Sequence, residues 1–214
     1  MNKFNILKSV ILCLFLSLVL FSAQSQNRYK VGLYVGGALP LGSFASDKYI
    51  EYNEEGTASF YNAASMGASF SFRYVYSWDG IFSEKDALGF FGEGSLIWNS
   101  VKKNIREEFG KSFYLHYNVK IGPSYTYYLG RDEELAIFGE LGILLGSTYL
   151  HTKDYKLNVG IGAGAGAGIY YMEWLTVGIY YDFLGVMKLS GKSNEGETKK
   201  IIPHILQLKV GFHF

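Results

Sequence analysis

Apolar and polar side chains alternate along most of this chain with a period of two residues. Between Phe113 and Leu129 the odd positions are mainly apolar and the even positions are mainly polar or small. The same period recurs over residues 175–183 and 204–214. A strand presents successive side chains to opposite faces, whereas an amphipathic helix repeats about every 3.6 residues. The pattern therefore predicts long β-strands, each with one apolar face.

The alternation predicts eight strands. They fall near residues 28–41, 59–76, 87–99, 113–129, 135–149, 155–171, 175–183 and 204–214. If the first strand runs outward from the periplasm, the outer connections are mostly long and charged, and they cover residues 43–57, 100–111, 150–154 and 188–202. The inner connections are mostly short, and they cover residues 77–86, 130–134 and 172–173. This asymmetry is typical of outer-membrane barrels, so we expect an all-β fold, an eight-stranded antiparallel up-and-down transmembrane β-barrel.

Aromatic residues gather where the predicted strands reach the periplasmic side. The set comprises Tyr74, Tyr76, Trp78, Tyr125, Tyr127, Tyr171, Trp174 and Phe214. Rings with a polar tip favour the headgroup layer of a membrane. A soluble β-sandwich also alternates, and there these rings would be ordinary core or edge residues. The loop asymmetry together with the aromatic rim favours the barrel. Pro123 falls inside a predicted strand, where its missing N–H predicts a bulge or a displaced boundary.

The first 25 residues have a different pattern from the rest of the chain. Lys3 and Lys8 precede an apolar run over residues 10–21, and the small residues Ala23 and Ser25 follow it. This order is typical of a secretory signal peptide, and the run is shorter than the roughly 18 residues of a membrane-spanning helix. We expect a signal peptide over residues 1–25, cleaved near Gln26, and a barrel domain over residues 26–214.

The composition excludes several classes of function. The single cysteine lies in the signal segment, so the mature chain would have no disulfide, thiolate ligand or thiol nucleophile. Without Lys3 and Lys8, 18 basic residues stand against 19 acidic ones, and no basic block suits a nucleic acid. The 18 Tyr, 16 Phe and 26 Gly with only three Pro favour closely packed strands.

Two segments, Gly36–Phe44 and Leu208–Phe214, carry a resemblance to a known family. The chain resembles the small outer-membrane barrels that include OmpA-type transmembrane domains, OmpX-like proteins and PorT-like barrels of Gram-negative bacteria. The resemblance implies export through the periplasm to the outer membrane and insertion by the barrel-insertion machinery. It also implies that Phe214, Phe212 and Val210 form the signal that this machinery recognises.

Six charged residues fall on the face of the strands that is predicted to point inward. They are Arg73, Glu93, Lys120, Glu140, Asp182 and Lys209. Isolated charges in a narrow barrel would be costly, whereas paired and hydrogen-bonded charges can fill it. The alternating signs on neighbouring strands therefore predict a paired network and an interior that is closed to ions.

Glycine occupies every second position from Gly160 to Gly168. A dinucleotide-binding loop needs Gly-x-Gly-x-x-Gly before a helix, and Ala165 breaks that spacing. We interpret the run as a strand with a bare inward face. The bare face would leave room for the side chains of Phe138, Leu144 and Tyr180, or for a small cavity.

The chain contains no serine-hydrolase elbow, no His-Glu-x-x-His pattern and no P-loop. His116 is predicted to point inward, where it could approach Ser or Glu side chains as a lipid hydrolase requires. A structural role for His116 is favoured. His151 and His204 lie at predicted outer strand ends, where a metal pair is conceivable but solvated residues are the default. We expect no catalytic, cofactor or metal site.

The leading hypothesis is a non-enzymatic, monomeric outer-membrane barrel that acts as a closed anchor in contact with outer-membrane lipids and lipopolysaccharide. Its loops would serve envelope integrity, adhesion, or binding of an envelope or host-surface partner. One alternative is a lipid-modifying enzyme of the outer membrane. Another is a narrow transporter or an assembly component of a secretion system.

Overall fold

The computed structural model describes residues 27–46, 50–52, 58–60, 62–129, 134–151, 155–157, 159–172, 174–191 and 199–214. The expected signal peptide, with Ala23 and Ser25, lies outside these residues and stays a prediction. Within the described part of the chain, no helix has both the length and the apolar character that crossing a membrane requires.

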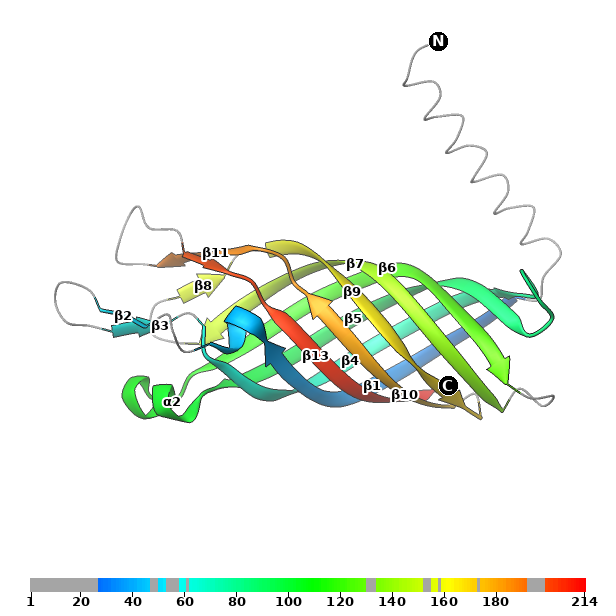
Figure 1. Cartoon of the computed structure of the whole chain (residues 1–214), viewed down its shortest axis with the longest axis horizontal. Helices are drawn as coiled ribbons and strands as arrows, with labels where there is room; N and C mark the ends of the chain where they lie inside the picture. The colour runs from blue at the N-terminus through cyan, green and yellow to red at the C-terminus, as the bar shows by residue number, and fades with distance from the viewer. Residues whose placement is uncertain are drawn as a thin grey trace, which may run out of the picture.

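Eight long strands form a closed barrel (Figure 1). They are β1 (Asn27–Leu41), β4 (Ala64–Asp79), β5 (Asp86–Val101), β6 (Phe113–Leu129), β7 (Leu135–His151), β9 (Val159–Tyr171), β10 (Leu175–Phe183) and β13 (His204–His213). Each long strand pairs antiparallel with the next long strand in the chain, and β1 pairs with β13 to close the barrel. The predicted eight-stranded antiparallel fold is therefore confirmed.

The two ends of the barrel differ in their connections. One end carries short additional elements: η1 (Gly42–Ala45), β2 (Ile50–Tyr52), β3 (Ala58–Phe60), α2 (Lys103–Phe109), β8 (Tyr155–Leu157), β11 (Met187–Gly191) and β12 (Lys199–Ile201) (Figure 1). At the opposite end, short turns join β4 to β5, β6 to β7 and β9 to β10. Outer-membrane barrels have short periplasmic turns and longer extracellular loops. We therefore call these the outer end and the periplasmic end.

Alternation along each strand separates a lumen face from an outer face. In β6, Asn118 and Lys120 are buried, while Val119 and Ile121 between and beside them are 57% and 62% exposed. Large apolar side chains are exposed in the same way on the other long strands, among them Val35, Phe72, Leu96, Ile143, Ile161, Ile179 and Leu208. A water-soluble protein rarely exposes so continuous an apolar surface. This surface faces lipid, and the barrel is transmembrane.

Aromatic side chains ring the periplasmic end of this apolar surface. Tyr74, Tyr125, Tyr171, Trp174 and Phe214 are exposed, and Tyr76, Trp78 and Tyr127 are partly exposed. Trp174 stacks on Phe212, with 6.2 Å between the ring centroids. Rings of this kind are favoured at the level of the lipid headgroups.

The predicted strand start at residue 59 was wrong, and the start predicted near residue 155 lies slightly before the start of the barrel strand. The barrel strand β4 begins at Ala64, and residues 58–60 form β3, which pairs with β2. Barrel strand β9 begins at Val159, and β8 pairs with β11 in a separate three-stranded sheet. Alternation continues from β8 into β9, so the pattern cannot reveal that the hydrogen-bonding partner changes.

The expected bulge or boundary at Pro123 was also wrong. β6 continues through Pro123 without a break. Ile121 pairs with Ile143 on β7, the two residues after Ile121 have no partner on β7, and pairing resumes in the same register between Ser124 and Glu140. Proline lacks an N–H, so the ladder is interrupted there while the strand itself continues.

Candidate functional site in the barrel interior

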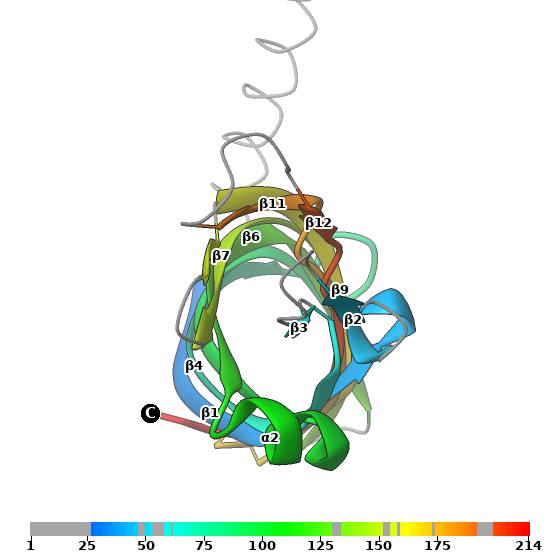
Figure 2. The same cartoon turned by 90° about the vertical axis from the view of Figure 1, so that its left-hand side faces the viewer.

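Three layers of side chains fill the barrel between its outer and periplasmic ends. An apolar cluster lies at the outer end, charged residues occupy the middle, and a second cluster, rich in aromatic rings, lies toward the periplasm. Figure 2 looks into the barrel from the outer end, with α2 at the rim. The ring of strands looks hollow as a ribbon, but buried side chains occupy it.

The outer plug is a cluster of buried apolar side chains. Its members are Ala38, Phe44, Ala63, Ala64, Ile97, Val101, Ile105, Tyr114, Leu144, Leu150, Leu184, Met187, Ile201 and Ile205. Phe44 comes from η1 and Ile105 from α2, so two outer connections contribute side chains to the plug. The Phe44 ring meets Tyr114 edge-on, with 4.9 Å between the centroids. The outer mouth is therefore closed by groups that avoid water.

Below the plug, the six inward charged residues form one network. Lys209 Nζ donates to Glu93 Oε1 at 2.6 Å and to Ser71 Oγ at 2.9 Å. Lys120 Nζ lies 3.0 Å from Asp182 Oδ1 and 4.0 Å from Glu93 Oε1. The remaining two members are Arg73 and Glu140, which form an ion pair. Arg73 Nη1 also lies 3.6 Å from Glu93 Oε2, which connects this pair to the others.

Neutral polar side chains also donate hydrogen bonds to this network. Ser95 donates to Glu93 at 2.7 Å, and Gln207 donates to Asp182 at 2.7 Å. The six charged residues are buried, with exposures from 0% to 5%. Three cations face three carboxylates, so the layer carries no net charge. Buried charges are tolerated when they are paired and hydrogen-bonded in this way.

Three of these ion pairs join strands that are not neighbours in the barrel. Lys120 lies on β6 and Asp182 on β10, Arg73 on β4 and Glu140 on β7, and Lys209 on β13 and Glu93 on β5. At least two strands separate the members of each pair around the wall. The three contacts therefore cross the lumen and fill its central section.

The glycines of β9 leave space for this network. A Cβ atom on Gly164 would lie 2.6 Å from Asp182 Oδ1 and 2.8 Å from Lys120 Cδ. A Cβ atom on Gly166 would lie 2.5 Å from the Tyr180 ring and 2.8 Å from Glu140 Oε1. Ring packing against the glycine face was the expectation, and Tyr180 does pack there. Sequence reasoning missed that the charged network uses the same space.

The periplasmic layer consists of Tyr34, Ala87, Tyr128, Ala136, Phe138, Tyr170 and Tyr180. The Arg73 guanidinium lies 4.8 Å from the Phe91 ring and 5.6 Å from the Phe138 ring, and Lys209 Nζ lies 4.8 Å from the Tyr180 ring. Ring faces attract cations in this geometry. The layer therefore both closes the lumen below the network and supports its cations.

The histidines occupy four separate environments. His116 points inward, as expected, but its Nδ1 lies 2.7 Å from Thr148 Oγ1, and no Ser or Glu side chain bonds to it among the described residues. His151 is exposed and stacks on Phe113, and His204 bonds to the Tyr181 hydroxyl. His213 lies at the periplasmic end. No three metal-binding side chains cluster in the described part of the chain.

The residues of the expected insertion signal lie on the last barrel strand. Phe212 and Phe214 are exposed on the outer face, and Phe214 is tied to β1 by a bond from its backbone N to the Val31 carbonyl at 3.0 Å. Val210 lies between Val35 and Val177 on the neighbouring strands. Their role in insertion stays a prediction.

Sequence reasoning missed Phe44 and Ile105, which lie in connections without a periodic pattern. The available signal was an isolated large apolar residue within a polar segment. Such a residue in a loop is either exposed or folded back onto the protein, and the sequence does not choose between these outcomes.

The chain is similar in structure to several solved barrels. The Neisserial surface protein NspA aligns with a TM-score of 0.49 and 12% identity over 88% of this chain and 98% of that chain. The outer membrane protein OprG from Pseudomonas aeruginosa aligns with a TM-score of 0.47 and 13% identity over 89% of this chain and 96% of that chain. The outer membrane enzyme PagL aligns with a TM-score of 0.40 and 13% identity over 84% of this chain and 97% of that chain.

No protein-family model matches the sequence, and no curated protein sequence matches it significantly. The assignment therefore rests on the geometry of the barrel itself. The eight strands close on themselves, the outer face is apolar, aromatic rings mark the periplasmic border, and the connections are short at one end and long at the other. The chain therefore has the fold of a small transmembrane β-barrel, with the architecture that outer-membrane barrels show.

Proposed function

We propose that this barrel is a closed, non-enzymatic anchor that holds its outer connections at the cell surface. The observation that carries the proposal is the set of three ion pairs across the lumen, which lies directly beneath the outer plug. An ion or solute on the barrel axis would have to break these pairs without water to replace them. Breaking a buried pair costs about 3–5 kcal/mol.

Solute entry into proteoliposomes tests this closed state. We expect vesicles that contain the protein to swell in an isotonic solution of a small sugar no faster than empty vesicles. A general porin reconstituted in the same lipids provides the positive control. Rapid swelling that scales with the amount of barrel would refute the proposal.

A role in presenting the outer connections is supported by the way they are built. Backbone bonds tie Ala63 to Phe44 at 3.1 Å and Lys102 to Ala63 at 2.9 Å, so η1, the start of β4 and the start of α2 are linked. A connection fixed at its base can display a defined surface to a partner. The partner would be another envelope component or a host surface.

Replacing residues 103–109 by a short Gly-Ser linker tests the presentation role. We expect the variant barrel to insert normally and to lose attachment to cells or to envelope partners that the wild type retains. A matched linker in the periplasmic turn at residues 80–85 should leave attachment unchanged. Full attachment after removal of each outer connection in turn would contradict the anchor role.

The environment of His116 supports the non-enzymatic part of the proposal. Its ring lies beneath the Phe44 ring, with 5.3 Å between the centroids, and it is fully buried. A lipid on the outer face of the barrel would not reach it. Incubation with outer-membrane lipids should yield no acyl release or transfer beyond the level of a heat-denatured sample, and His116-dependent turnover would overturn this part.

A further inference from the structure

The turn between β4 and β5, residues 80–85, folds around one buried carboxylate at the periplasmic end. Asp86 is 1% exposed, and its Oδ1 accepts the backbone N–H groups of Ile81 and Phe82 at 3.0 and 3.2 Å. The Gly80 N–H donates to the Asp86 carbonyl at 2.8 Å, and Gly80 has a φ of 71°, which glycine adopts without strain. These bonds hold the first half of the turn in one conformation.

The turn contacts the lipid-facing side of β6. The Tyr125 hydroxyl donates to Asp86 Oδ2 at 3.3 Å, and Tyr125 belongs to the aromatic ring at the membrane border. The Tyr128 backbone N–H donates to the Lys85 carbonyl at 2.8 Å, which ties the second half of the turn to the same strand. The Phe82 ring lies beside the Tyr125 ring, with 6.4 Å between the centroids. Phe82 therefore extends the aromatic ring from the strands onto a turn.

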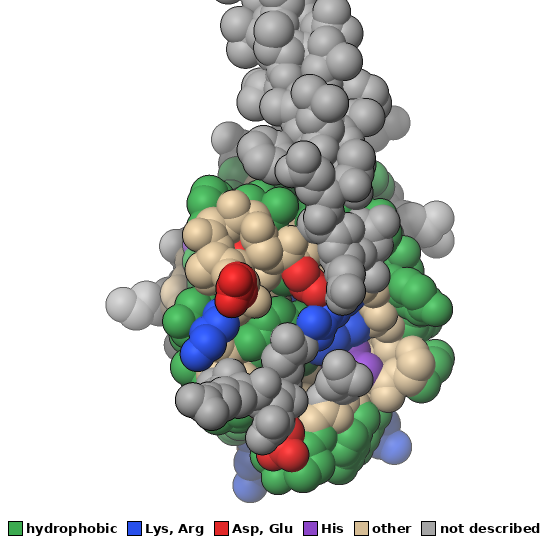
Figure 3. Space-filling view, turned by 90° about the vertical axis from the view of Figure 1, so that its right-hand side faces the viewer, with side chains coloured by type: hydrophobic (Ala, Val, Ile, Leu, Met, Phe, Trp, Pro, Cys, Tyr) green, Lys and Arg blue, Asp and Glu red, His purple; other side chains and the backbone are tan. Residues whose placement is uncertain are grey.

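Phe82 presents a large apolar surface at this border. Its side chain is 76% exposed, and the exposed, charged residues Glu84 and Lys85 follow it in the turn. Figure 3 views the molecule from this end, where hydrophobic side chains lie around much of the edge. Apolar side chains enter the headgroup–acyl boundary of a membrane, whereas charged groups stay in water. An exposed phenylalanine beside Tyr125 therefore suits a lipid surface.

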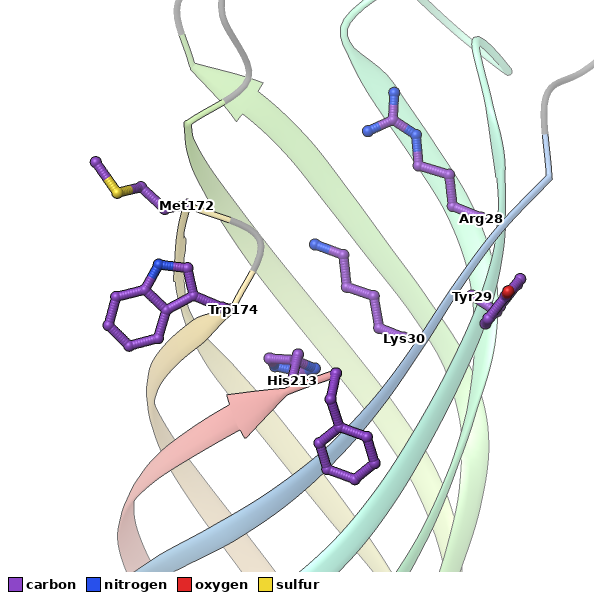
Figure 4. Close-up of a pocket in the computed structure, with 7 residues that line it drawn as sticks. Arg28, Tyr29, Lys30, Met172, Trp174 and His213 are labelled. Atoms are coloured by element: carbon purple, nitrogen blue, oxygen red, sulfur yellow. The ribbon is translucent and has the colours of Figure 1, made fainter.

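A second group of apolar side chains lies on the opposite side of the barrel. Counted around the wall, β9 lies three strands from β5, and β10 lies three strands from β4. The turn between β9 and β10 carries Met172 and Trp174, which are 41% and 48% exposed. Figure 4 shows both side chains pointing away from Lys30 and His213. Anchors at two opposite points of the membrane border would fix the tilt of the barrel as well as its depth.

We propose that the turn at residues 80–85 is a membrane-docking element, in which Asp86 holds Phe82 in the headgroup–acyl boundary of the leaflet at the periplasmic end. The partner is the phospholipid surface, because a single exposed ring recognises an apolar boundary rather than a particular headgroup. Apolar groups at such a boundary reach a depth of about 5–10 Å. The element acts at the opposite end from the connections that the proposed function uses.

A fluorophore at position 82 tests the proposal. Cys13 is the only cysteine of the chain and lies in the expected signal segment, so Phe82→Cys in residues 26–214 carries the label alone. The barrel is placed in phosphatidylcholine nanodiscs, which leave both membrane faces accessible. We expect a nitroxide near the lipid headgroup to quench the label. Aqueous iodide should quench it several-fold less than the same label on the matched control, Glu84→Cys.

Asp86→Ala, added to the labelled Phe82→Cys protein, tests how the turn is held. Without the carboxylate, the label should gain iodide access to nearly the level of Glu84→Cys, whereas Asp86→Asn keeps an acceptor oxygen and should retain most of the protection. Heat-modifiable gel migration establishes that each variant is folded. If Asp86→Ala does not fold, Tyr125→Phe removes only the hydroxyl donor and should give a partial gain in access.

Three results would overturn the proposal. Equal iodide access at positions 82 and 84, or a label at 82 that lipid nitroxides do not quench, would place the ring in water. Unchanged protection in the folded Asp86→Ala protein, or in Tyr125→Phe where that variant replaces it, would remove the role of Asp86. Protection at position 82 in intact outer membranes but not in nanodiscs would assign the ring to a periplasmic protein and reject the lipid surface.

Discussion

At the scale of single residues, Glu93 is the centre of the barrel interior. It accepts hydrogen bonds from Lys209 and Ser95, and it also lies 4.0 Å from Lys120 and 3.6 Å from Arg73. The other two carboxylates each pair with a single cation, Glu140 with Arg73 and Asp182 with Lys120. Removing the charge of Glu93 therefore affects all three cations at once.

Glu93→Gln should destabilise the folded barrel by about 3–5 kcal/mol, because it leaves three buried cations facing two carboxylates. Urea unfolding in lipid vesicles, followed by gel mobility, measures this difference. Glu107→Gln is the matched control, since its carboxylate is exposed on α2 with Lys103 3.7 Å away, and losing such a surface pair costs about 0.3–0.5 kcal/mol. Equal unfolding midpoints for Glu93→Gln and the wild type would contradict the importance of the network.

At the scale of elements, the glycines of β9 leave space inside the barrel because they have no side chains. Its inward positions Gly164 and Gly166 lie beside Asp182, Lys120, Tyr180 and Glu140. The repeat of glycine at every second position predicted a strand with a bare inward face. The sequence predicted that rings such as Tyr180 would use this space, but it did not reveal that the charged residues share it, because that depends on the stagger of strands far apart in the chain.

Gly164→Ala should destabilise the barrel by about 1–3 kcal/mol, because the added methyl group overpacks the interior and displaces Lys120 or Asp182. Gly139→Ala is the control within a neighbouring strand, since a Cβ atom there would meet nothing within 4 Å. The same urea titration compares the two variants. A Gly164→Ala barrel that is as stable as Gly139→Ala would show that β9 does not make room for the network.

The long strands were predictable, because each has one lumen face and one lipid face, and its side chains therefore alternate in type with a period of two residues. The inward positions of Arg73, Glu93, Lys120, Glu140, Asp182 and Lys209 follow from the same period. Their partners do not, because Lys120 and Asp182 are separated by 62 residues and their contact crosses the lumen. The separate sheet of β8, β11 and β12 was missed for a similar reason, since alternation indicates a strand but not its neighbour.

At the scale of the whole molecule, the barrel combines an apolar outer face with a filled interior. The outer plug excludes water, the charge network spans the lumen, and the aromatic layer closes the periplasmic side. These three layers follow one another along the barrel axis, so opening one layer leaves the other two in place. This arrangement suits an anchor whose outer connections meet the surroundings while the membrane stays sealed.

Phe44→Ala combined with Ile105→Ala should cost about 4–10 kcal/mol in stability by emptying the outer plug, from about 2–5 kcal/mol for each large side chain removed. It should nevertheless leave the membrane sealed, because the ion pairs below remain. Urea unfolding measures the first effect and solute entry into vesicles measures the second. Rapid solute entry through this double variant would show that the plug alone closes the barrel.

Single-channel current recording from the purified wild-type protein in a planar lipid bilayer tests the closed interior most directly. With the plug, the ion pairs across the lumen and the aromatic layer intact, we predict no stable conductance steps at moderate voltage and salt. Large, long-lived steps from folded, heat-modifiable protein would contradict the closed barrel and favour a transporter.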